Sequence, residues 1–118
     1  MSSNNQTGTD QVMDVSSAVE RLGSEKLLKR VAGVFLENAT KHTTDIKDAI
    51  ATHDDKKLEM AAHTLVSSMA YLSASFASAA AMKLEHMGRD GVVDGLQDAY
   101  DQLLTEIDRL AEALKPLL

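Results

Sequence analysis

Apolar residues recur three or four positions apart along almost the whole chain, which is the spacing of one face of an α-helix. The single proline, Pro116, lies near the C-terminal end, so no earlier position forbids a long helix. Only 3% of the residues are aromatic and there is no tryptophan, whereas β-strands are enriched in aromatic and β-branched side chains. We therefore predict an all-α fold.

Short polar or glycine-containing segments interrupt the apolar pattern. The predicted connections lie at residues 23–24, 53–55, 73–75 and 88–91, and residues 38–40 are a candidate bend or break. Because short connections make antiparallel neighbours, we predict an antiparallel up-and-down four-helix bundle with a short additional N-terminal helix. Residues 1–12 are polar and aperiodic and are predicted to be a disordered tail, which leaves 13–118 as the helical domain.

Charge and composition argue against several classes of partner. The net charge of −6 disfavours nucleic acid, and no basic tract or long apolar run indicates a membrane. The chain has no cysteine, which excludes disulfides and thiol chemistry. No signal peptide is apparent, so we expect a cytoplasmic protein.

His63 is the main candidate for a functional residue. In the predicted helix over residues 56–72 it falls roughly 140° from the centre of the apolar face, so it should point outward. A solvated helix face normally carries long charged side chains, whereas small or weakly apolar neighbours would let another protein approach the imidazole closely. The residues that we expect to form a docking face around His63 are Lys56, Met60, Val66, Ser67 and Ala70.

Local motifs add to this geometry. Residues 61–68, AAHTLVSS, resemble the core motif of the histidine-containing phosphotransfer (HPt) family, with matches at Ala62, His63, Leu65 and Ser68. Residues 84–89, LEHMGR, resemble a turn of the same family, and the whole resemblance runs from about residue 14 to the end.

The resemblance implies a four-helix phosphocarrier in a two-component phosphorelay rather than an enzyme. His63 would accept a phosphoryl group from a receiver-domain aspartate, or from a kinase, and pass it to another receiver. The implied partners are a response-regulator receiver domain and a hybrid histidine kinase, and the protein would be a monomer. It would need no cofactor of its own, because Mg²⁺ is expected on the receiver.

Two departures from the family motif leave other hypotheses open. The family has lysine three residues after the histidine and glycine four residues after it, where this chain has Val66 and Ser67. The Ser67 hydroxyl could donate a hydrogen bond to phosphate in partial compensation. The alternative is a degenerate HPt-like bundle that docks a receiver or kinase without accepting phosphate. A third hypothesis is a self-associating structural bundle.

The remaining polar candidates have simpler explanations. His42 is expected to be a half-buried histidine, and His53 and His86 fall near helix ends. Glu59 and His63 are one helical turn apart but have no third ligand nearby in the sequence, so no metal site is predicted.

Overall fold

The computed structural model describes residues 12–118, and this part of the chain contains helices and no strand. The helices are α2 (Val15–Leu22), α3 (Glu25–Ala51), α4 (Asp55–Tyr71), α5 (Ser75–Asp90), α6 (Leu96–Leu114) and a short 3-10 helix, η2 (Lys115–Leu117). The all-α prediction is confirmed. Within residues 12–118, no helix combines the length and the apolarity that a membrane span requires.

The helix starts follow from local capping. Asp14, Ser24 and Asp54 each accept a hydrogen bond from a backbone N–H three residues later, which satisfies a donor that the helix cannot pair internally. Helix α2 ends at Gly23, where φ is 97°, a left-handed conformation that glycine adopts without steric cost. Connections therefore occur at residues 23–24 and 53–54, as the sequence predicts.

Two of the predicted interruptions do not occur where they were expected. Helix α3 continues without a break through residues 38–40, with Ala39 buried against its neighbours. Helix α5 continues through Gly88 to Asp90, and the connection to α6 begins only at Gly91, where φ is 68°. The predicted turn at residues 88–91 was therefore placed about one helical turn too early.

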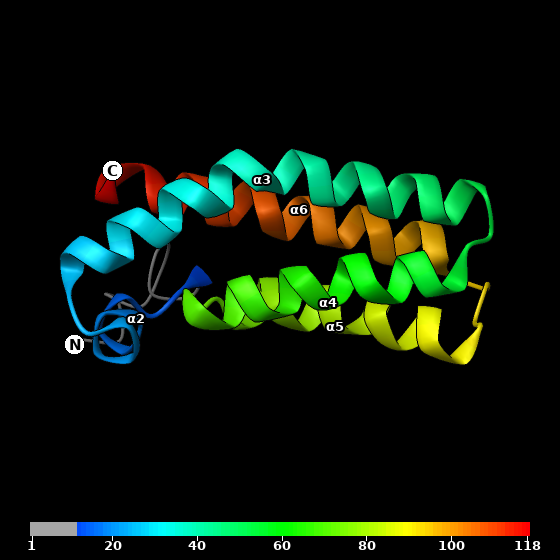
Figure 1. Cartoon of the computed structure of the whole chain (residues 1–118), viewed down its shortest axis with the longest axis horizontal. Coiled ribbons are helices and arrows are strands. Elements are labelled where there is room, and N and C mark those ends of the chain that lie inside the picture. Colours follow the sequence, from blue (N-terminus) through cyan, green and yellow to red (C-terminus); the bar gives the residue numbers. More distant parts are fainter. Residues whose placement is uncertain (1–11) are drawn as a thin grey trace, which may run out of the picture.

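The four long helices lie alongside one another. Helix α4 packs mainly on α5 and also on α3, while α6 packs on α5 and α3. Figure 1 shows α3 and α6 as one pair above α4 and α5, with α2 near one end. Leucine side chains fill the centre; those that are almost fully buried are Leu28, Leu58, Leu65, Leu72, Leu84, Leu103, Leu110 and Leu114.

Helix α2 is joined to the end of the α4–α5 pair by two hydrogen bonds. The Arg21 guanidinium donates to the carbonyl oxygen of Ala70 at 2.6 Å, and the Asp14 N–H donates to the carbonyl oxygen of Ser73 at 3.0 Å. Residues 1–11 of the predicted tail lie outside the described residues. Its last residue, Val12, is buried in the core together with Met13.

Gly88 sets how closely α4 and α5 approach. A Cβ atom at this position would lie 2.8 Å from the Glu59 backbone nitrogen and 2.9 Å from the Asp55 carbonyl oxygen. Real Cβ atoms essentially never make such short contacts, so only glycine allows the two backbones to come this near. Because Glu85 precedes Gly88 by one turn and His63 follows Glu59 by one turn, this close approach also brings Glu85 toward His63.

Candidate functional site

His63 projects from α4 into solvent. Its helix buries Leu58, Ala62, Leu65 and Met69 against the other helices, and the His63 side chain is 65% exposed. The outward direction agrees with the expectation from helical periodicity. The imidazole is therefore accessible to a second protein without any rearrangement of the bundle.

One hydrogen bond from the neighbouring helix orients the imidazole. His63 Nδ1 lies 2.8 Å from Oε2 of Glu85 on α5, and the Glu85 side chain is only 18% exposed. An ionised carboxylate can only accept, so this bond places the ring proton of a neutral imidazole on Nδ1. In that tautomer the other ring nitrogen, Nε2, carries the available lone pair.

Glu85 was not predicted as a site residue. It lies 22 residues from His63 in the sequence and on a different helix. The only signal was its place in the segment LEHMGR, which the resemblance to the HPt family identified as a turn. A pattern that could have identified Glu85 is its spacing: it lies one helical turn before the buried Gly88, on the helix that follows the one carrying His63.

A shallow cavity of about 380 Å³ lies beside the imidazole. Its lining residues are Lys56, Glu59, Met60, His63, Thr64 and Glu85. Two members of the predicted docking face, Lys56 and Met60, therefore share a cavity with His63, and the Met60 side chain is largely exposed. Lys56 and Glu59 form a loose ion pair, with Nζ 4.0 Å from Oε1.

The other three predicted docking residues lie further along α4 and do not line this cavity. Ser67 is exposed, whereas Val66 is half-buried and packs against the core. Ala70 is also half-buried, and its carbonyl oxygen accepts the hydrogen bond from Arg21. The predicted docking residues therefore fall into two sets. Lys56 and Met60 line the cavity beside the imidazole, and the other three lie further along α4, with Ala70 in contact with Arg21 of α2.

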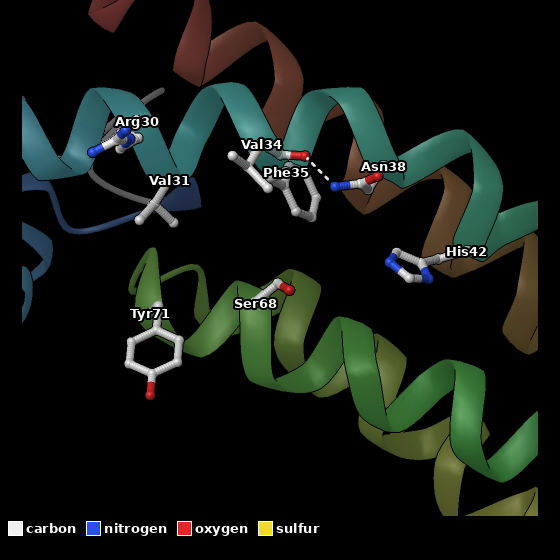
Figure 2. Close-up of a pocket in the computed structure, with 8 residues that line it drawn as sticks. All are labelled: Arg30, Val31, Val34, Phe35, Asn38, His42, Ser68 and Tyr71. Carbon is white, nitrogen blue, oxygen red and sulfur yellow. Dashed lines mark hydrogen bonds between the residues drawn. The ribbon is translucent and has the colours of Figure 1, made fainter.

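A second cavity, of about 330 Å³, lies between α3 and α4 and was not predicted. Its lining residues are Arg30, Val31, Val34, Phe35, Asn38, His42, Ser68 and Tyr71 (Figure 2). Val34 and Tyr71 are exposed apolar or aromatic side chains from its two walls. His42 is half-buried here, as expected, and lies on the α3 wall facing the cavity.

Within residues 12–118, no group of three or more histidine, cysteine, aspartate or glutamate side chains is placed to hold a metal ion. The ring nitrogen Nδ1 of His63 is instead engaged by Glu85.

Comparison with known proteins identifies the family. The family model for the Hpt domain matches residues 30–113, from the second turn of α3 to the last turn of α6, and so includes both His63 and Glu85. No curated protein and no solved structure matches the chain. Since the matched segment spans well over half of the sequence, the chain belongs to the Hpt domain family, whose members act in histidine phosphotransfer.

Proposed function

We propose that this protein is a phosphorelay intermediate that carries a phosphoryl group on Nε2 of His63. Membership of the Hpt family implies a histidine phosphotransfer role. The observation that supports this residue and this atom is the 2.8 Å bond from His63 Nδ1 to Glu85, combined with the exposure of the ring.

The proposed chemistry is a reversible transfer between a nitrogen and a carboxylate oxygen. Nε2 attacks the phosphorus of an aspartyl phosphate on a receiver domain, the Nε2–P bond forms, and the P–O bond to the aspartate breaks. The aspartate leaves as a carboxylate, and the imidazole becomes positively charged because Nδ1 keeps its proton. The Glu85 carboxylate stabilises that charge, and phosphoryl transfer otherwise needs mainly positioning and charge neutralisation.

The remaining features of the proposal concern the partners and the assembly. The receiver would contact the docking face formed by Lys56, Met60, Val66, Ser67 and Ala70, and would supply Mg²⁺. A hybrid histidine kinase is the proposed source of the phosphoryl group. The protein would act as a cytoplasmic monomeric phosphocarrier rather than an enzyme. Its helices would form an antiparallel up-and-down four-helix bundle, with α2 as the additional N-terminal helix.

The test is transfer from purified receiver domains that carry a labelled phosphoryl group. We expect the native protein to take up an acid-labile, base-stable label and the His63→Gln variant to take up none. The His86→Gln variant is the matched control, because His86 is an exposed histidine on α5 and should leave labelling unchanged. Circular dichroism should show equal helicity in all three proteins.

Two outcomes would contradict the proposal. Label that persists in His63→Gln would exclude His63 as the acceptor. Absence of label on the native protein, with receiver binding still measurable, would instead favour a docking role without phosphate.

A further inference from the structure

The surroundings of His63 contain more negative than positive charge. The charged side chains that line its cavity, apart from the imidazole, are the carboxylates of Glu59 and Glu85 and the ammonium group of Lys56. A phosphoryl group on Nε2 would add a further dianion at this position. The lysine that the family carries three residues after the histidine is absent, because Val66 occupies that position. The phosphorylated site therefore needs a cation from elsewhere.

Lys56 is placed to provide that cation. It precedes His63 by seven residues, which on an α-helix is about 10 Å along the axis and only about 20° around it. Glu59 lies between the two residues on the same face of α4, and the contact of Lys56 Nζ with Glu59 shows that the ammonium group already reaches toward His63. The Lys56 side chain is 78% exposed, so this pair is weak and the ammonium group can exchange partners readily.

The other nearby cations are directed elsewhere. Arg89 lies on α5 one turn after Glu85, but its Nε contacts Asp90 at 3.3 Å and the residue does not line the cavity. Lys83 lines a different hollow on α5, together with Met82 and His86. Among the described residues, Lys56 is therefore the one lysine or arginine in the His63 cavity.

We propose that Lys56 neutralises the phosphoryl group on His63 and so takes the role of the missing lysine at position 66. This inference rests on the proposed function. The cation would approach from the N-terminal side of the imidazole, past Glu59, rather than from the following turn. Lys56 is thus a positioning and charge-compensating residue for the phosphoryl group, beyond its place in the docking face.

The test compares single neutralising substitutions with two phosphodonors. Phosphoramidate transfers its phosphoryl group to histidine without a protein partner: the Nε2–P bond forms, the P–N bond breaks and ammonia leaves. For Lys56→Gln we expect phosphorylation of His63 to fall about tenfold at low ionic strength, from the attraction of one charge to a dianion across about 5 Å at high dielectric. The loss should occur with phosphoramidate and with a phosphorylated receiver alike, and added salt should reduce it.

Lys57→Gln is the matched control. It makes the same change in net charge at the adjacent residue, but Lys57 does not line the His63 cavity; it lines a neighbouring hollow, which Lys56 also borders, and Lys57→Gln should leave the rate unchanged. Adding Val66→Lys to Lys56→Gln should restore most of the lost rate, because the cation then returns on the other side of the ring.

Other results would contradict the proposed role of Lys56 in neutralising the phosphoryl group. Equal losses in Lys56→Gln and Lys57→Gln would indicate a general charge effect, and a loss confined to Arg89→Gln would assign the role to that arginine. A loss seen with the receiver but not with phosphoramidate would mean that Lys56 contacts the partner instead. If the native protein and Lys56→Gln are labelled equally, only this inference fails; if the native protein takes no label from either donor, the proposed function fails with it.

Discussion

The contact between His63 and Glu85 bears on which ring nitrogen of His63 carries the proton. The Glu85 side chain is only 18% exposed, whereas the imidazole that it contacts remains accessible. A free histidine side chain can place its proton on either nitrogen, and the carboxylate removes that choice. At the scale of single residues, the reactivity proposed for His63 therefore depends on a side chain from the next helix.

Replacing Glu85 with alanine should slow phosphorylation of His63 about fivefold, since an exposed charge-assisted hydrogen bond contributes about 1 kcal/mol. Nitrogen NMR of the imidazole should show the proton moving from Nδ1 toward Nε2 in this variant. Glu59→Gln is the control for the position of the proton, because Glu59 lines the same cavity and has no hydrogen bond to His63. An unchanged proton position and rate in Glu85→Ala would exclude the positioning role.

The α4–α5 pair forms the rigid support for that contact. Gly88 is buried within α5 and faces the backbone of α4 between Asp55 and Glu59. Its hydrogen atom occupies the space where any other residue would place a carbon. At the scale of secondary-structure elements, the distance between the two helix axes therefore depends on this one residue, and so does the reach of Glu85 to His63.

Gly88→Ala should lower the free energy of unfolding by about 1–3 kcal/mol, because the added methyl group overlaps the α4 backbone. Gly33→Ala is a matched control within α3, where a new Cβ would meet no atom within 4 Å. This second change should raise stability by up to about 1 kcal/mol through helix propensity alone. Urea denaturation of both variants measures the two effects, and stabilisation by Gly88→Ala would contradict the close approach of the helices.

At the scale of the whole molecule, Tyr100 links α6 to α3. The residue is buried, and its hydroxyl donates to the carbonyl oxygen of Thr43 at 3.4 Å. Burial raises the pKa of Tyr100 above its ordinary value of 10.0, and the negative charges of Asp101 and Asp48 raise the pKa further. Ionisation of this phenol is therefore less favourable in the folded protein than in the unfolded chain.

This raised pKa predicts how stability depends on alkaline pH. The pKa of this phenol in the unfolded chain is about 10. Its contribution to stability is complete below that pH and is lost as the pH rises through the higher pKa that the phenol has in the folded protein. Between pH 8 and pH 11, the unfolding free energy of the native protein should therefore fall more steeply than that of Tyr100→Phe. Tyr71→Phe is the control, because Tyr71 is exposed, and it should follow the native protein. Parallel curves for all three proteins would contradict the effect of burial.

The helical content and the exposure of His63 could be predicted from the sequence because both are local properties. Periodicity of apolar residues decides which face of a helix is buried, and the polar or glycine-containing segments at residues 23–24 and 53–55 mark where helices end and begin. The family motif around His63 is equally local. These patterns need only residues within a few turns of one another, so they identified the class of fold and the candidate nucleophile.

Only the tertiary structure reveals that Glu85 is the hydrogen-bond partner of His63. The segment Gly88-Arg89-Asp90-Gly91 has the composition of a turn, and nothing local distinguishes a turn glycine from one that lies where two helices cross. Packing makes Gly88 helical and leaves Gly91 to end α5. The same packing brings Glu85 onto Nδ1 of His63 across 22 residues of sequence, because a hydrogen bond between helices depends on their separation and rotation, which the pattern within either helix does not contain.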